Sequence, residues 1–126
     1  MIDYIITKLE GVLDRYHQWS IEEREVADNA LRSISNALTE TRLYYRDIEE
    51  GIPKNKDRER QLVLLWSAAA IPVRHIDPEL AGICQDKSDY WLNPENWDDQ
   101  RIIETGISLE NVNNRFKKLL KKTRRK

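Results

Sequence analysis

The residues of this chain that could do acid–base or metal chemistry are two histidines and their neighbours. Neither His17 nor His75 belongs to a metal-ligand set of the HExxH kind, in which two histidines four positions apart on one helix face bind zinc and the glutamate acts as general base. Arg74 and His75 stand beside Pro72, an irregular point in a predicted helix. A histidine at a helix end, where the dipole favours a cation, is the simpler interpretation of that pair. An enzyme built from dispersed residues such as Arg74, His75 and Asp89 is therefore the least favoured hypothesis.

The other residues that could bind a metal or act as a nucleophile are a row of carboxylates and one cysteine. Glu22, Glu25 and Asp28 lie on one face of a predicted helix and offer the oxygen ligands that magnesium prefers. The same row at the start of a helix complements the positive end of the dipole, and this structural interpretation is favoured. Cys84 lies on a predicted inner face without a companion histidine, which favours a buried structural thiol over a nucleophile. The sequence thus predicts no catalytic residue, no metal site and no cofactor.

The C-terminal segment is strongly basic. Residues 115–126 carry eight basic side chains and no acidic one, whereas the remaining residues carry 13 basic against 22 acidic side chains, a net charge of −9. Such asymmetry is typical of partner binding, and the cations could neutralise nucleic-acid phosphates. A solvated helix end with a frayed terminus is the favoured alternative. The candidate phosphate contacts are Lys117, Lys118, Lys121, Lys122, Arg124 and Arg125.

An aromatic cluster surrounds a turn rich in Asp and Asn. Tyr90, Trp91, Trp97 and the neighbouring Asp89 form a candidate surface for a partner protein, because Trp and Tyr are enriched at binding hot spots. The same aromatic residues are common in half-buried cores, and for Trp91 and Trp97 the core interpretation is favoured.

The spacing of apolar residues predicts the elements that must position these groups. Steps of three and four predict an amphipathic helix over 1–19. Ser20 and Glu23 form a capping box that opens a second helix, which ends at Gly51. Its apolar positions match a heptad seam. The seam consists of Ala27, Leu31, Ile34, Leu38, Thr41, Tyr45 and Ile48.

Proline and glycine mark the later helix boundaries. A polar connection over 52–56 precedes a third helix with apolar positions from Leu62 to Ile76, which should kink or end near Ile71 because Pro72 removes a hydrogen bond. Asp77 and Pro78 open a fourth helix. A short fifth helix is predicted from Pro94 to Gly106, and a last one begins after the cap at Ser108.

These elements predict an all-α fold, a single domain with a helical bundle of four main helices plus two shorter ones. The bundle is expected over residues 1–120, followed by a basic tail over 121–126. Four Gly and four Pro in 126 residues are too few turn signals for a β-sandwich. No apolar run reaches the length of a transmembrane helix and no signal peptide is visible, so no membrane contact and a cytoplasmic location are expected.

The absence of a catalytic motif and the long heptad seam favour a small non-enzymatic adaptor or regulatory protein that acts through a partner protein. The seam could mediate self-association into a dimer, or it could pack inside one bundle. Nucleic-acid or phosphate binding through the basic C-terminal helix and tail is the alternative.

Overall fold

The computed structural model describes residues 2–92 and 99–123, and the side chains of residues 4–92, 109–121 and 123. Within those ranges the chain forms five α-helices and one 3-10 helix, without a strand. The elements are α1 (Ile2–Val12), η1 (Leu13–Gln18), α2 (Ile21–Glu49), α3 (Lys56–Val73), α4 (Pro78–Leu92) and α5 (Asp99–Thr123). The predicted all-α fold is confirmed, but the number and lengths of the helices differ from the prediction.

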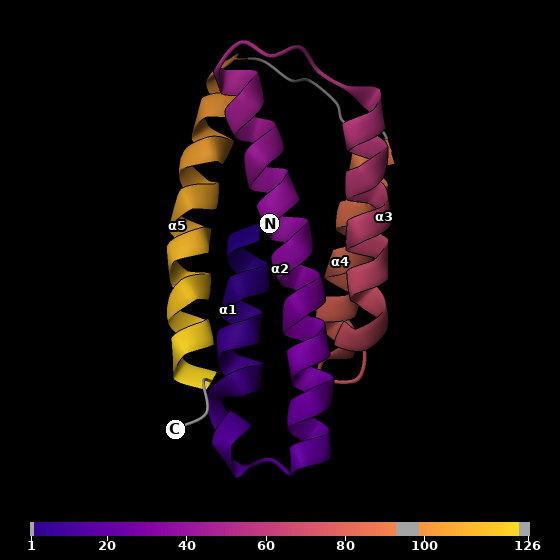
Figure 1. Ribbon diagram of the computed structural model, residues 1–126, viewed down its shortest axis with the longest axis vertical. Coiled ribbons are helices and arrows are strands. Elements are labelled where there is room, and N and C mark those ends of the chain that lie inside the picture. Colours follow the sequence, from indigo (N-terminus) through magenta and orange to yellow (C-terminus); the bar gives the residue numbers. More distant parts are fainter. Residues whose placement is uncertain (1, 93–98, 124–126) are drawn as a thin grey trace.

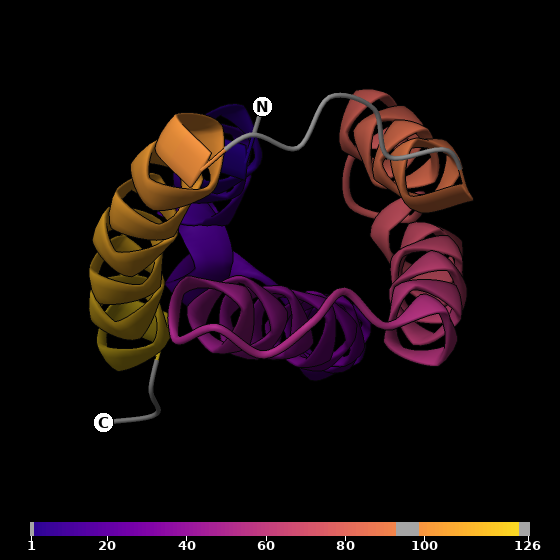
Figure 2. The same cartoon turned by 90° about the horizontal axis from the view of Figure 1, so that it is seen from above.

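Helix α2 lies between two helix pairs (Figure 1). Seen from above, α3 and α4 lie on one side of α2, and α1 and α5 lie on the other (Figure 2). Helix α3 packs against α2 and α4, whereas α5 packs against α2 and α1. Helix α2 therefore connects the two sides of the molecule.

Both ends of α2 are determined by local sequence. The Glu23 amide donates to the Ser20 hydroxyl and the Glu23 carboxylate accepts from the Ser20 amide, each at 3.2 Å. Gly51 follows the helix with a φ of 94°, a conformation that costs glycine little. The predicted seam is buried within this chain except for the half-buried Ile48. The seam therefore packs inside one bundle and is not available to a second copy.

Side-chain caps and Pro72 set the ends of α3 and α4. The Asn55 side chain accepts from the Arg58 amide at 3.0 Å, so α3 begins inside the segment predicted as a connection. The helix ends at Val73, directly after Pro72. This end is expected because proline has no backbone N–H to donate to the preceding turn. The Asp77 carboxylate then accepts from the first amides of α4, which confirms the predicted start.

The prediction of two separate helices after residue 93 is wrong where the structure describes the chain. Helix α5 runs without interruption through Gly106 and Ser108 to Thr123. A glycine inside a helix costs only about 1 kcal/mol relative to alanine, which tertiary packing can offset. That packing comes from four buried side chains on one face of α5, namely Leu109, Val112, Phe116 and Leu119. The predicted start at Pro94 lies outside the described residues.

The first predicted helix also differs, because it is divided. Helix α1 ends at Val12 and continues as the 3-10 helix η1, in which Arg15 departs from helical backbone angles with φ −103° and ψ 16°. Trp19 is extended and leads into α2. The apolar positions of both parts remain on the inner side, since Leu9, Leu13 and Tyr16 are buried.

One apolar core joins all the helices, and its centre contains a buried hydrogen-bond relay. The Trp66 indole N–H donates to the Thr41 hydroxyl at 3.1 Å, and this hydroxyl donates to the Ala37 carbonyl at 2.7 Å. Both Trp66 and Thr41 are fully buried, so each polar atom has a partner inside the core. Cys84 is also fully buried, and burial raises the pKa of its thiol to about 12. This confirms the structural interpretation of the cysteine.

Surface ion pairs attach α1 to both neighbouring helices. The Lys8 ammonium lies 2.7 Å from the Glu79 carboxylate at the start of α4. The Arg115 guanidinium of α5 donates to Glu10 at 2.5 Å and to Thr7 at 3.1 Å. In the part of the chain that is described, no helix combines the length and apolar character needed to cross a membrane.

Candidate functional site

The aromatic cluster predicted as a partner surface is divided by the structure. Trp91 is 3% exposed, and its ring lies 5.8 Å from those of Tyr44 and Tyr45. Trp91 is therefore a core residue and is not available as an exposed contact, in agreement with the favoured interpretation of its pattern. Tyr90 is half-buried with Lys87 over its ring, and Asp89 is exposed. Trp97 lies outside the described residues.

The dispersed residues of the enzyme hypothesis do not come together. Arg74 and His75 follow the end of α3 and are exposed. Asp89 lies near the other end of α4, and the separation of eleven positions from Pro78 to Asp89 corresponds to about 17 Å along a helix. No reacting atom could contact both groups.

The carboxylate row at the start of α2 is a solvated face. Glu22, Glu25 and Asp28 are all exposed, and Asp28 accepts a hydrogen bond from the Tyr16 hydroxyl at 2.8 Å. Among the side chains that can be described, no three His, Cys, Asp or Glu gather where they could hold a metal ion. The row therefore has a structural explanation in this fold.

The basic residues of α5 lie on its outer face. Lys117, Lys118 and Lys121 are exposed and form no ion pair with any residue that the structure describes. Helix α5 continues past the predicted tail boundary to Thr123, which is 7% exposed. The side chain of Lys122 and the residues Arg124 and Arg125 lie outside the description.

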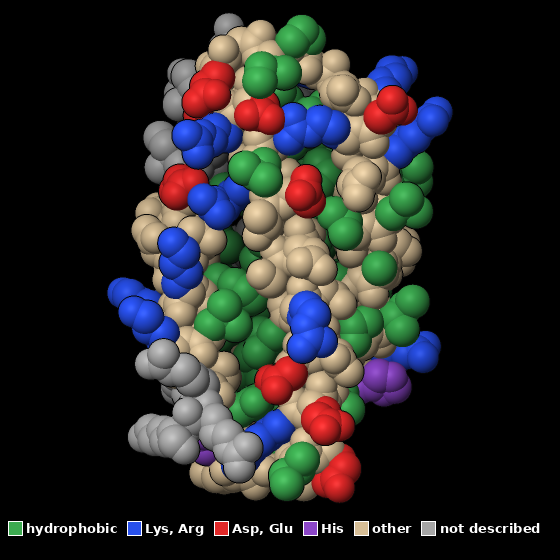
Figure 3. Space-filling view, viewed as in Figure 1, with side chains coloured by type: hydrophobic (Ala, Val, Ile, Leu, Met, Phe, Trp, Pro, Cys, Tyr) green, Lys and Arg blue, Asp and Glu red, His purple; other side chains and the backbone are tan. Residues whose placement is uncertain are grey.

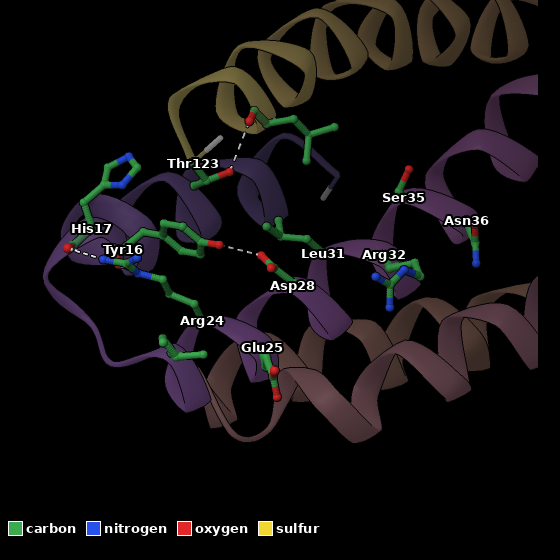
Figure 4. A pocket seen from close by; sticks show the side chains of 12 residues that line it. Tyr16, His17, Arg24, Glu25, Asp28, Leu31, Arg32, Ser35, Asn36 and Thr123 are labelled. Atoms are coloured by element: carbon green, nitrogen blue, oxygen red, sulfur yellow. Dashed lines mark hydrogen bonds between the residues drawn. The ribbon is translucent and has the colours of Figure 1, made fainter. Parts of the chain in front are cut away.

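A groove that the sequence analysis missed opens between η1, the first half of α2 and the end of α5. It encloses about 1070 Å³, and its side chains are drawn in Figure 4. We call it the η1–α2–α5 groove. Its lining residues are Tyr16, His17, Ile21, Arg24, Glu25, Asp28, Leu31, Arg32, Ser35, Asn36, Leu120 and Thr123.

Arg24 and Tyr16 build one wall of this groove. The Arg24 side chain donates to the main-chain carbonyls of Tyr16 at 3.1 Å and His17 at 2.5 Å, at the end of η1. Its guanidinium also lies 5.6 Å from the centre of the Tyr16 ring. Burial and the hydrogen bond to Asp28 raise the pKa of the Tyr16 hydroxyl. Figure 4 shows Tyr16 and Asp28 turned toward each other across the wall.

The floor and rim of the groove are partly apolar. Leu31 is buried in the floor, while Leu120 is 41% exposed and Ile21 is 71% exposed. Several of the polar side chains around them are already bonded inside the protein. The Thr123 hydroxyl donates to the Leu119 carbonyl at 3.1 Å, and Arg32 donates to Asn29 at 2.9 Å. The groove therefore combines the apolar contact area of Ile21, Leu31 and Leu120 with a larger number of polar groups, several of which are fixed by bonds within the chain.

The groove does not bring a hydroxyl of α2 close to His17. Its one hydroxyl on α2, that of Ser35, lies eleven residues from Arg24, which contacts His17, and this corresponds to about 17 Å along the helix. A nucleophile and a base must be within about 3 Å of each other, or joined by one water. Ser35 and His17 therefore cannot act as a catalytic pair.

The sequence contained only a weak signal for this groove. Ile21 and Leu120 are apolar, but the concave surface depends on how η1, α2 and α5 lie relative to one another. Comparisons with protein-family models, with curated proteins and with solved structures found no match to this chain.

Proposed function

We propose that this protein is a non-enzymatic interaction protein that binds a segment of a partner protein in the η1–α2–α5 groove. The observation that supports the proposal is the composition of the groove. Apolar side chains line its floor and rim, whereas Tyr16, Asp28 and Arg24 already have partners within the chain. A partner that covers these groups does not leave them without hydrogen bonds, because their hydrogen bonds are made within this chain.

The length of the groove indicates what such a segment would look like. Along α2 it extends from Ile21 to Asn36, about 22 Å at the rise of an α-helix. This length along α2, with η1 and the end of α5 beside it, corresponds to an amphipathic helix of about four turns. The apolar face of that helix would contact Leu31 and Leu120.

Affinity purification of the tagged protein from its native cell tests the proposal. Leu120→Asp places a charge in the groove, and Leu43→Asp is a matched control because both leucines are 41% exposed and only Leu120 lines the groove. We expect a stoichiometric partner that survives high salt with the wild type and with Leu43→Asp, but not with Leu120→Asp. Circular dichroism would verify that both variants fold. A partner retained equally by both variants would contradict the proposal.

Anion binding by α5 is a second candidate, because its three exposed lysines have no ion pair among the described residues. Fluorescence anisotropy with single- and double-stranded oligonucleotides would measure it. Binding by Lys117, Lys118 and Lys121 should weaken steeply with salt, and reversing all three charges should reduce that salt dependence. Arg46→Glu is the control on α2. If no binding occurs even at low salt, this candidate is excluded.

A further inference from the structure

The outer face of α3 is apolar where a surface helix is normally polar. Leu64 is 69% exposed and Ile71 is 60% exposed, and the exposed Ala68 lies between them at helical spacing. We call these three residues the α3 stripe. The opposite face of α3 is buried through Leu62, Trp66, Ala69 and Val73. Figure 3 shows hydrophobic side chains gathered over α3 along one edge of the molecule.

Cations stand at both ends of the α3 stripe. Lys56 and Arg60 precede it, Arg74 follows it, and all three are exposed. Neither Arg60 nor Arg74 forms an ion pair within the described ranges, and Asp57 is the acidic residue on the same face. The two arginines are separated by fourteen residues, or about 21 Å along the helix. The stripe is therefore an apolar strip between two positive ends.

This charge pattern disfavours a second copy of the chain as the occupant. In an antiparallel pair in which Leu64 contacts Ile71 of the other copy, Arg60 would approach the Arg74 of that copy. In a parallel pair each arginine would approach its own counterpart. Like charges that face each other across an interface weaken it.

The pattern also disfavours a membrane surface. Interfacial helices carry a wide face with large apolar and aromatic side chains, with cations distributed along the polar face. The α3 stripe has three apolar residues, none of them aromatic, and its cations lie at the two ends. A narrow strip of this length instead matches one side of another helix.

We infer that the α3 stripe docks an amphipathic helix of a partner protein whose apolar positions are flanked by acidic residues about fourteen positions apart. The apolar side chains would cover Leu64 and Ile71, and the acidic residues would pair with Arg60 and Arg74. This surface lies on α3, whereas the η1–α2–α5 groove is lined by η1, α2 and α5. The inference goes beyond the proposed function, since a protein with both surfaces could connect two partners.

Two synthetic helical peptides of about 18 residues test the inference, long enough to cover the distance between the arginines. One carries leucines at i, i+4 and i+7 with glutamates at both ends, and the other has lysines in place of the glutamates. Titrated into the isotope-labelled full chain, the glutamate peptide should shift backbone amide signals of residues 56–75. Leu64→Asp should weaken this binding about tenfold, whereas the groove variant Leu120→Asp should leave it unchanged.

A charge exchange sharpens the test. The double variant Arg60→Glu and Arg74→Glu should lose the glutamate peptide and bind the lysine peptide instead. Arg32→Glu, a variant in the groove, is the control and should not change the preference.

Three results would overturn the inference. The first is no peptide-dependent shift in α3. The second is a dimer in sedimentation that Leu64→Asp dissociates, because a second copy would then occupy the stripe. The third is binding to phosphatidylglycerol vesicles that Leu64→Asp abolishes, because a lipid surface would then be the partner.

Discussion

The two sides of the molecule are held together by different interactions. On the α3 side, fully buried Trp66 and Thr41 join α3 to α2 through an internal hydrogen bond, in addition to the ion pair between Arg58 and Asp47. On the α5 side, apolar contacts are supplemented at the surface by the pairs Arg42–Glu110 and Arg115–Glu10. Buried packing contributes far more to stability than exposed ion pairs do. We therefore expect stability to reside on the α3 side, while the α5 side opens into a groove.

Trp66→Ala should cause the largest loss and thus test the comparison most directly. Removing this fully buried side chain should lower the free energy of unfolding by about 3–5 kcal/mol. Urea denaturation would measure the change. Leu64→Ala, two residues earlier on the same helix but 69% exposed, should change stability by less than about 0.5 kcal/mol. Similar losses in the two variants would show that α3 is not packed as described.

Thr41→Val should have the next largest effect. Valine retains the shape but leaves the Trp66 indole N–H without its acceptor in the core, at a cost of about 1–3 kcal/mol. Thr41→Ser is the matched control, because it keeps the hydroxyl, and it should lose less than the valine variant. The reverse order in urea denaturation would mean that the relay contributes little.

Tyr44 should make the α2–α3 contact sensitive to alkali. Burial and the hydrogen bond that Tyr44 donates to Glu59 at 2.6 Å raise its pKa to about 12 from an ordinary value of 10.0. The folded state thus binds the proton more tightly than the unfolded state. This contribution to stability is complete below pH 10.0 and is lost as the pH rises toward about 12.

Unfolding measured across that pH range checks the expectation. Tyr44→Phe should be less stable at neutral pH, and its stability should decrease less steeply between pH 10.0 and about 12 than that of the wild type. Tyrosinate absorbance should show that the variant lacks one of the late-titrating tyrosines of the wild type. An equally steep decrease in both proteins would assign the alkaline transition to other groups.

Arg42→Ala should have the smallest effect. Its guanidinium lies 3.1 Å from the exposed Glu110 carboxylate, and such surface pairs contribute about 0.2–1 kcal/mol, less in salt. Urea denaturation at low and high salt would detect a difference that salt removes. A loss comparable to that of Thr41→Val would show that the α5 side depends on its ion pairs.

The features that could be predicted from the sequence are those determined within a few residues. The capping box at Ser20 and Glu23, the stop at Gly51 and the start of α4 at Asp77 each depend on a side chain and its nearest amides. Apolar spacing likewise identified the buried seam of α2, because one face of a helix must be covered. These local rules establish the all-α fold.

The predicted helix boundaries were wrong where tertiary packing outweighs the preference of a few neighbouring residues. Gly106 was interpreted as a helix end, but buried contacts of Leu109 and later residues support a continuous α5. The break at Arg15 lies next to a contact with α2, in which Arg24 binds the carbonyls of Tyr16 and His17. The groove could not be predicted for the same reason, because it exists only through the relative placement of three elements.

The contact of Arg24 with η1 has a further consequence for how fast and how tightly a partner would bind. Its two hydrogen bonds to main-chain carbonyls connect the end of η1 to the first turns of α2 before any partner arrives. A wall that is already ordered loses little conformational entropy on association, so more of the apolar contact energy appears as affinity. No loop has to fold before the partner binds. The association rate constant can therefore approach that of two rigid proteins.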